Sequence, residues 1–342
     1  MYNSKFDYII IGGGFYGSYL ATILGKNKKV LLIDKNISLM RAASFANQTR
    51  LHEGAHYLKS MDTARSSNFY SNELKKLFPE IIVQNSKHCY ALPETYSSIT
   101  SEQFAQKCEI LGISFHRIRD KILTIPHTTY NVLEDNYDPS VLRESIIKKI
   151  NFSNVEIKLN ITIIKVEVNL SGFAITLSDL SKIYVKNVYN VTYTQVNEIN
   201  RLFNIDEIST VTEYVEIPLL YIPIFLKKAL TVIDGPYLSL TPFGSSKLHN
   251  LTSVIYSHHS AEKNLQNRET FQNFILKQFK VLLLPKYQNF TYHGTLISKK
   301  ITLKANDALD SRPLVIKKNG NYTQIIGTKI SNIIEMENTL AF

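Results

Sequence analysis

The sequence predicts an α/β protein in which a domain with a central parallel sheet is interrupted by a mostly antiparallel, α+β-type domain. Over the first 34 residues the patterns follow the order strand, turn, helix, strand that opens a parallel sheet. Strand patterns then gather between residues 211 and 256, in the middle of the chain. With 342 residues, the chain is long enough for two such domains.

The opening βαβ unit is predicted from two apolar runs. Residues 6–11 are apolar except for Asp7, as expected of a strand buried on both faces, and residues 30–33 form a second run of this kind. The turn between them spans residues 12–17, and a helix is expected over residues 18–25.

The turn carries the pattern G-x-G-x-x-G, formed by Gly12, Gly14 and Gly17. The first glycine allows a tight turn, the second lets the backbone approach a pyrophosphate, and the third lets the helix pack close to the strand. The helix N-terminus then offers a partial positive charge to the phosphates. Asp34 ends the second strand, where a carboxylate can accept hydrogen bonds from ribose hydroxyls. Together these features predict dinucleotide binding, without separating NAD from FAD.

The remaining elements follow from hydrophobic periodicity and helix caps. Helices are expected over residues 62–78, 101–111, 139–150 and 268–284, the second of them capped by Ser101. Strands are expected over residues 88–92, 155–159, 161–168, 173–177 and 183–191, and between residues 211 and 256 with turns at 234–236 and 242–244.

The composition is that of an ordinary globular protein. Hydrophobic residues make up 44% and charged residues 20% of the chain, which excludes disordered and collagenous proteins. The two cysteines, Cys89 and Cys108, exclude a disulfide framework and favour a cytoplasmic location. The net charge of +10 favours anionic partners, but the basic residues are scattered, so no nucleic acid is expected. Residues 8–24 carry no charge, yet their four glycines argue against a transmembrane segment.

Residues 52–56 match the pattern H-E-x-x-H. On a helix, this spacing places two histidines on one face to bind zinc, with the glutamate as base. Gly54 and the polar residues before His52 are poor for a rigid helix, and the position of a third histidine is Asp62. No metal site is therefore expected, and a zinc metallohydrolase stays an alternative.

Residues 44–58, SFANQTRLHEGAHYL, resemble the second conserved segment of FAD-dependent oxidoreductases of the D-amino-acid oxidase type. The similarity is to 2-hydroxyglutarate-dehydrogenase-like and glycerol-3-phosphate-dehydrogenase-like members. Three later segments resemble motifs of this superfamily in the same order: residues 189–193 its V-N-A-T strand end, residues 312–314 its R-P-L segment, and residues 327–331 its G-G-K-L-T turn. His56 stands where glycerol-3-phosphate-type members have an arginine.

The resemblance implies a Rossmann-like FAD-binding domain of residues 1–85, 139–204 and 300–342, with a substrate-binding domain of residues 86–138 and 205–299. Non-covalent FAD is expected, because the last cysteine is Cys108 and a cysteine linkage in the C-terminal part is excluded. The residues implied to bind FAD are Gly12, Gly14, Phe15, Tyr16, Gly17, Asp34, Lys35, Ser44, Asn47, Gln48, Ile163, Thr192, Gly327, Thr328, Lys329 and Ile330.

The resemblance further implies hydride transfer to flavin from a C–OH or C–NH carbon of a small polar, anionic substrate. A base must accept the accompanying proton, and His52 is the first candidate, His56 the second. Arg312 would clamp an anionic group, and Lys329 would stabilise negative charge on reduced flavin. Tyr57 would line the site beside the flavin ring.

Several functional questions stay open at the level of sequence. The electron acceptor can be oxygen, a quinone or another protein, and the basic net charge would suit peripheral contact with an anionic membrane surface. A non-redox, mutase-like flavoenzyme acting on a sugar derivative is an alternative, as is a binding or structural role.

Overall fold

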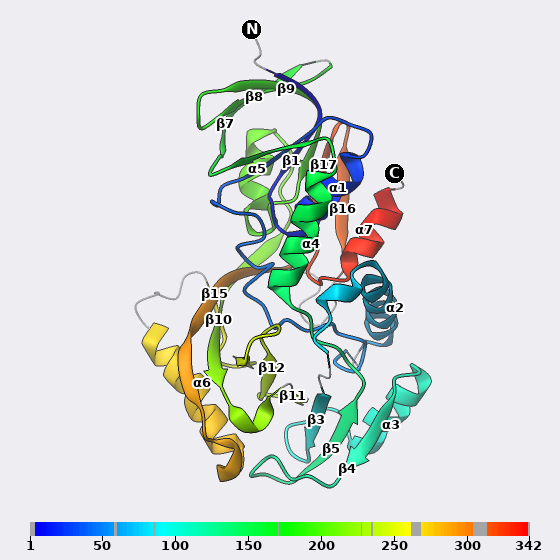
Figure 1. Ribbon diagram of the computed structural model, residues 1–342, viewed down its shortest axis with the longest axis vertical. Helices are drawn as coiled ribbons and strands as arrows, with labels where there is room; N and C mark the ends of the chain where they lie inside the picture. The colour runs from blue at the N-terminus through cyan, green and yellow to red at the C-terminus, as the bar shows by residue number, and fades with distance from the viewer. Residues whose placement is uncertain are drawn as a thin grey trace.

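The computed structural model shows two sheets, one in each half of an elongated molecule (Figure 1). The structure describes residues 4–57, 60–84, 87–169, 171–226, 228–233, 235–260, 268–303 and 313–340. Both ends of the chain lie in the half that holds the first sheet. Among the described residues, no helix is long and apolar enough to cross a membrane.

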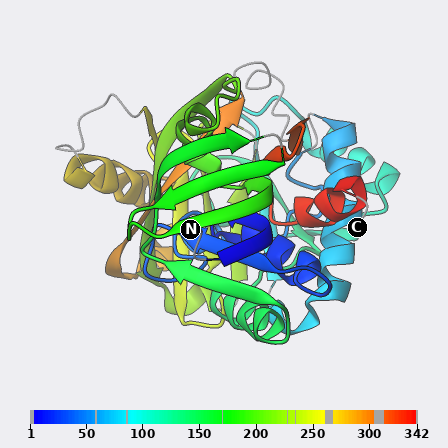
Figure 2. The same cartoon turned by 90° about the horizontal axis from the view of Figure 1, so that it is seen from above.

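The first sheet has a parallel core. Its strands are β1 (Ser4–Ile11), β2 (Val30–Asp34), β6 (Val155–Leu159), β7 (Ile163–Asn169), β8 (Gly172–Leu177), β9 (Lys182–Asn190), β16 (Val315–Asn319) and β17 (Tyr322–Ile326). The order is β16–β17–β9–β1–β2–β6, in which every neighbouring pair is parallel except β16 and β17. From β9 the sheet continues through antiparallel pairs to β8 and β7, seen from above in Figure 2.

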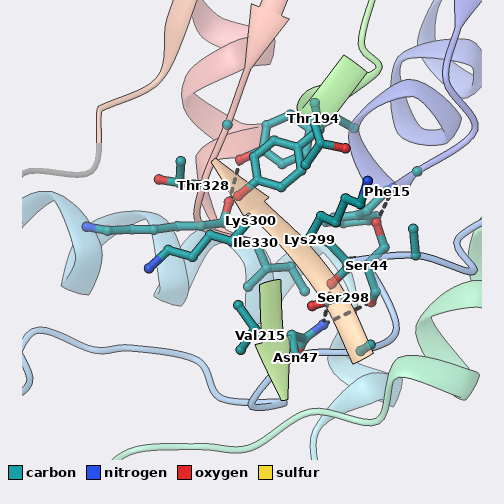
Figure 3. Close-up of a pocket in the computed structure, with 18 of the residues that line it drawn as sticks. Phe15, Ser44, Asn47, Thr194, Val215, Ser298, Lys299, Lys300, Thr328 and Ile330 are labelled. Carbon is teal, nitrogen blue, oxygen red and sulfur yellow. Dashed lines mark hydrogen bonds between the residues drawn. The ribbon is translucent and has the colours of Figure 1, made fainter. Parts of the chain in front are cut away.

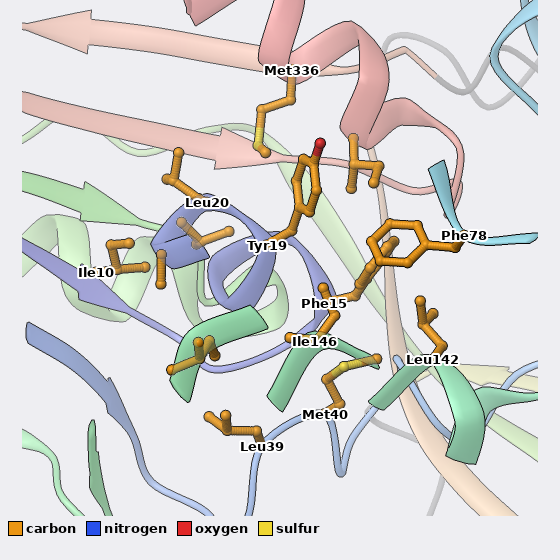
Figure 4. Packing of buried hydrophobic residues seen from close by; sticks show 14 of the residues in the cluster. Ile10, Phe15, Tyr19, Leu20, Leu39, Met40, Phe78, Leu142, Ile146 and Met336 are labelled. Atoms are coloured by element: carbon orange, nitrogen blue, oxygen red, sulfur yellow. The ribbon is translucent and has the colours of Figure 1, made fainter. Parts of the chain in front are cut away.

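Both faces of this sheet are covered, which explains the continuous apolar runs of residues 8–11 in β1 and 30–33 in β2. On one face Ile10 and Leu32 pack against helices, with Leu20 and Ile146 in the same cluster (Figure 4). On the other face the alternate residues, including Ile9, pack against β8 and its neighbours. The helices of the protein are α1 (Phe15–Leu24), α2 (Met61–Leu77), α3 (Ser101–Ile110), α4 (Pro139–Asn151), α5 (Val196–Leu202), α6 (Arg268–Leu282) and α7 (Asn332–Leu340), with short 3-10 turns at Pro79–Ile81, Tyr193–Gln195, Pro223–Phe225 and Pro285–Tyr287.

The second sheet is almost wholly antiparallel. Its strands are β3 (Lys87–Pro93), β4 (Phe115–Ile118), β5 (His127–Val132), β10 (Thr210–Tyr221), β11 (Lys228–Val232), β12 (Leu238–Pro242), β13 (Leu248–Ser253), β14 (His258–Ser260) and β15 (Thr291–Leu303). The order is β14–β10–β13–β12–β11–β3–β5–β4, with β15 paired to β10; only β11 and β3 are parallel among the described strands. Helix α6 contributes Ile275 and Phe279 to a core shared with this sheet.

Two predicted details are wrong. Helix α1 begins at Phe15 and not at residue 18, because Gly14 already adopts the extended conformation of a cap, so Gly17 lies inside the helix. Helix α3 is capped by Thr100 and not by Ser101. The Thr100 side chain accepts the Gln103 N–H, and the Gln103 side chain accepts the Thr100 N–H, which forms a capping box.

The predicted fold class is confirmed, since one sheet has a parallel core and the other is mostly antiparallel. The strands of the first sheet come from residues 4–34, 155–190 and 315–326, and those of the second from residues 87–132 and 210–303. The domain boundaries given above remain a prediction.

Candidate functional site

A cavity of about 1140 Å³ opens where the carboxyl ends of β1, β2 and β9 face the second sheet. Open α/β sheets bind ligands at this end of their strands. The volume exceeds the roughly 300–1,000 Å³ typical of sites for drug-sized ligands, so a dinucleotide and a small substrate can share it. Figure 3 shows Phe15 and Ser44 on one side of the cavity and Thr328 and Ile330 on the other.

The cavity gathers predicted residues that are far apart in the sequence. It is lined by all the predicted FAD-binding residues except Gly17, which packs inside α1, and by the predicted catalytic residues His52, His56, Tyr57 and Lys329. Arg312 lies outside the described residues.

The glycine turn is packed too tightly for side chains. Gly12 has φ +108°, and a Cβ there would lie 2.6 Å from the Val191 carbonyl oxygen. A Cβ on Gly17 would lie 1.9 Å from the Gly12 carbonyl oxygen. Both positions therefore need glycine for the turn to pack against the end of β9 and the start of α1, and the turn meets the cavity at Gly12 and Gly14, where a pyrophosphate could approach the backbone.

Two polar side chains hold this turn from other elements. The Gly13 N–H donates to Asp34 Oδ2 at 2.6 Å, and the Asn36 N–H donates to Asp34 Oδ1 at 2.7 Å. The N-cap Gly14 has no capping side chain, and Ser44 Oγ instead accepts the Phe15 N–H at 2.9 Å. Ser44 and Asp34 are thus fixed at the two ends of the turn, beside the N-terminus of α1, where anions bind favourably.

The segment 327–331 is docked on α1. The Tyr16 hydroxyl donates to the Lys329 carbonyl oxygen, and burial raises the pKa of Tyr16 well above its usual value, which keeps the hydroxyl a donor. A Cβ on Gly327 would lie 2.1 Å from the Tyr16 ring, so any side chain there would displace that ring. Lys329 Nζ lies 4.1 Å from the centroid of the Tyr57 ring.

The loop of residues 44–57 connects the two sheets. The Asn47 amide donates to the Ser44 carbonyl at 3.0 Å, and its oxygen accepts from Thr49 N–H and the Tyr137 hydroxyl. Asn47 therefore shapes the loop as well as lining the cavity. Gln48 Nε2 donates to Thr252 Oγ1 of β13 at 2.9 Å, which fixes the loop to the second sheet.

The two histidines lie side by side on this loop. Their ring centroids are 4.8 Å apart, and the Tyr57 ring is 5.2 Å from His52 and 5.1 Å from His56. Residues 52–56 form a turn and no helix, and Glu53 turns away to bond Lys75 Nζ at 3.0 Å. No group of three or more His, Cys, Asp or Glu suited to a metal occurs among the described residues. The H-E-x-x-H pattern thus lacks the helical geometry that its zinc interpretation needs.

Behind His52 lies a buried ion pair that sequence reasoning missed. Arg50 Nη2 lies 2.8 Å from Glu134 Oε2, with neither side chain exposed. Arg50 also bonds Thr231 Oγ1 at 2.9 Å and the Tyr90 hydroxyl. Arg50 lies inside the motif of residues 44–58, whereas Glu134 lies in no motif. The only sequence feature that pointed to Glu134 was the polar segment that follows β5.

The protonation of His52 follows from these surroundings. Burial, and next the positive charge of Arg50, hold the pKa of His52 well below its usual 6.5. The imidazole is therefore neutral at neutral pH and able to accept a proton.

The sequence has one partial match among characterised proteins and a family match over its start. A family described as an NAD(P)-binding Rossmann-like domain matches residues 10–73. A FAD-dependent monooxygenase of Fusarium mangiferae is 31% identical over 107 residues, which are 31% of this chain and 29% of that protein. The matched part thus spans less than a third of that relative's length.

Solved structures match the whole chain in fold. L-α-glycerophosphate oxidase from Mycoplasma pneumoniae, with FAD bound, has a TM-score of 0.77 at 13% identity, covering 98% of this chain and 93% of that one. Glycine oxidase from Geobacillus kaustophilus has 0.74 at 12%, covering 96% and 91%. L-proline dehydrogenase from P. horikoshii has 0.74 at 15%, covering 97% and 90%. The fold expected from the motifs is therefore confirmed as the fold of these oxidases and dehydrogenases.

Proposed function

We propose that this chain, whose fold is that of D-amino-acid-oxidase-like flavoenzymes, is a FAD-dependent oxidoreductase that oxidises a small anionic substrate at a C–N or C–O carbon. The observation that carries the proposal is the shared cavity, which joins the glycine turn and Asp34 to the pair His52 and His56. A nucleotide site and a proton acceptor in one enclosed space are what flavin-linked dehydrogenation needs.

The residues present fit FAD. The bare backbone of the turn, where a Cβ on Gly12 would clash, suits a pyrophosphate, and Asp34 suits the ribose hydroxyls of the adenosine. Ser44 completes the phosphate end, while Gln48 and the segment 327–330 would hold the ring end. Bound FAD would supply the hydride acceptor. The binding is proposed to be non-covalent.

The remaining residues act on charge and protons. In the proposal, neutral His52 accepts the substrate's O–H or N–H proton, with His56 beside it as second candidate. Lys329, on a segment anchored by Tyr16, places a positive charge where reduced flavin would be anionic. Tyr57 forms a wall between this lysine and the histidines. Arg312 stays a proposed clamp for the anionic group.

The substrate class is proposed from two considerations. The similar structures are named as enzymes of glycerophosphate, glycine and L-proline, which are small anions or zwitterions. Basic side chains also outnumber acidic ones in the cavity wall, which favours an anionic substrate electrostatically; the basic ones are Lys35, Arg50, Lys299, Lys300 and Lys329, and the acidic ones Asp34, Glu198 and Glu213. Oxygen, a quinone or a protein would then reoxidise the flavin.

Anaerobic bleaching of bound flavin tests the proposal. The FAD-loaded protein is mixed with glycerol 3-phosphate, 2-hydroxyglutarate, glycine and proline in turn, and absorbance is followed by stopped flow. At least one compound is expected to bleach the flavin, and His52→Gln should slow that step about 10²- to 10⁴-fold. His116→Gln, an exposed histidine outside the cavity, is the matched control. A flavin that only dithionite reduces would contradict the proposed substrate class, and turnover of a sugar derivative after such reduction would favour the mutase alternative.

A further inference from the structure

We propose that Glu134, held by Arg50, is the positioning residue of His52, which it fixes in the tautomer with a proton on Nδ1 and a free lone pair on Nε2 toward the cavity. The inference deepens the proposed function and rests on it, because His52 is the base there. Glu134 itself lies outside every motif that the sequence offers.

The Glu134 carboxylate is a fixed acceptor. Its Oε2 accepts from Arg50 Nη2 at 2.8 Å and from the Tyr90 hydroxyl at 2.5 Å. Its Oε1 accepts the backbone N–H of Glu53 at 3.1 Å. Both side chains of the ion pair are shielded from solvent, so the carboxylate has no competing water to bond. Oε1 can accept a second hydrogen bond besides the one from the Glu53 N–H.

His52 turns one ring nitrogen toward this carboxylate. Nδ1 lies 3.7 Å from Glu134 Oε1, about 0.8 Å longer than an ordinary N–H···O hydrogen bond. Nδ1 is buried and has no hydrogen-bond partner among the described residues, so the carboxylate is the acceptor it can reach by a small ring movement. The backbone on the same residue is held firmly, because the His52 carbonyl accepts from Ser67 at 2.6 Å and Ser71 at 2.9 Å.

The other edge of the ring meets the cavity. The His52 side chain is 19% exposed, and buried Nδ1 contributes nothing to that exposure, so the accessible edge is the one that carries Nε2. A neutral imidazole has one N–H and one acceptor nitrogen. A carboxylate can only accept, so the proton is placed on Nδ1 and Nε2 becomes the acceptor. A proton released from the substrate's O–H or N–H then binds Nε2, and the resulting imidazolium faces Glu134.

Cationic groups outnumber carboxylates around His52, so Glu134 is the group there that would stabilise an imidazolium. The groups facing the ring that oppose a positive charge on it are Arg50, His56, Lys329 and His88. Glu134 is the carboxylate that faces it among the described residues, and Tyr57 packs edge-on. His88 lies 3.7 Å from Glu134 Oε2, but its Nε2 bonds Thr231 and it does not line the cavity. Of these two imidazoles beside the carboxylate, His52 is thus the one that links it to the cavity.

Glu134→Gln is the decisive variant. Arg50 and Tyr90 both donate to the position of Oε2, whereas only the Glu53 N–H donates to that of Oε1, so the glutamine oxygen is expected at Oε2 and its NH₂ group at Oε1, facing His52 Nδ1. A donor at that place reverses the tautomer, putting the His52 proton on Nε2. The readout is nitrogen NMR of the histidine-labelled, FAD-loaded protein, with the His52 signal assigned by His52→Gln. Glu53→Gln, the neighbouring carboxylate bonded to Lys75, is the matched control.

A second variant guards against loss of folding, because Glu134→Gln alone leaves the Arg50 charge buried and unpaired. Arg50→Met combined with Glu134→Gln removes both charges and keeps an acceptor for Tyr90. In wild type and Glu53→Gln the proton is expected on Nδ1, and in Glu134→Gln on Nε2. In the double variant, where Arg50 no longer fixes the amide oxygen, the preference for Nδ1 is expected to be lost. A proton on Nε2 in wild type, or an unchanged tautomer in a folded Glu134 variant, would overturn the inference. Absence of flavin binding would instead overturn the proposed function, since the tautomer can be read without a substrate.

Discussion

Replacing Gly327 by alanine would test how closely the segment 327–331 docks on helix α1. The new Cβ would lie 2.1 Å from the Tyr16 ring, which must retreat by about 1.3 Å to reach the 3.4 Å of ordinary contact. Overpacking of this kind costs about 1–3 kcal/mol, and loss of the Tyr16 bond to the Lys329 carbonyl about 1 kcal/mol more. Reduced freedom of the unfolded chain returns about 0.4–1 kcal/mol. We therefore expect a net destabilisation of about 1–3.5 kcal/mol.

The assay is a double-mutant cycle with Tyr16→Ala. The chain has no tryptophan, so urea unfolding is followed by far-UV circular dichroism. The three atoms nearest to the new Cβ all belong to Tyr16, so Gly327→Ala is expected to cost under about 1 kcal/mol in the Tyr16→Ala background. Equal costs of Gly327→Ala in both backgrounds would refute the close docking, and with it the anchoring that places Lys329 over Tyr57.

Three further predictions concern the cofactor site and pH. Gly12→Ala places a Cβ 2.6 Å from a carbonyl oxygen and should abolish FAD retention after gel filtration. The control Gly112→Ala, also at positive φ but in open space, should retain FAD. Equal retention by the two variants would count against the turn as the pyrophosphate site. Asp34→Asn should weaken FAD binding by about 1.5–3 kcal/mol, or about 10- to 150-fold, in a flavin-fluorescence titration, and an unchanged affinity would reduce Asp34 to a support of the turn. His52 and His88 have pKa values held well below 6.5 by burial and then by Arg50, so the unfolded chain takes up protons near pH 6.5 that the folded chain does not. The free energy of unfolding should therefore fall as pH drops below about 6.5, by up to about 1.4 kcal/mol per pH unit for each histidine. The double variant His52→Gln, His88→Gln should flatten the pH profile of the urea midpoint between about pH 6.5 and 5. An unaltered slope would show that the two rings are protonated in the folded protein.

The parallel half of the fold was predictable because its signals are local. Strands β1 and β2 are buried on both faces over residues 9–11 and 30–33, which are all apolar, and a glycine turn follows β1 at the start of α1. Strand β15 gave no such signal, because it pairs with β10 while exposing much of its surface, and Lys299 and Lys300 stand in it. Short β4 and β5 gave none either, since exposed His116 and Arg117 interrupt β4, and β5 begins with the polar residues His127, Thr128 and Thr129.

The candidate site divides in the same way. Gly12, Gly14 and Asp34 were found because turn chemistry fixes residue types over a few positions. The contact of Ser44 with the first N–H of α1 joins residues 29 apart, and the pair of Arg50 and Glu134 joins residues 84 apart. Such contacts depend on how the two sheets come together, which hydrophobic periodicity does not encode.

The most direct test of the central claim is the visible absorption spectrum of the purified protein, reconstituted with FAD and freed of excess, before and after acid precipitation. The account predicts a yellow protein with about one flavin per chain, all of it released into the supernatant because the binding is non-covalent. Flavin retained in the precipitate would contradict the non-covalent site. A protein that takes up no FAD at all would contradict the assignment of the cavity itself.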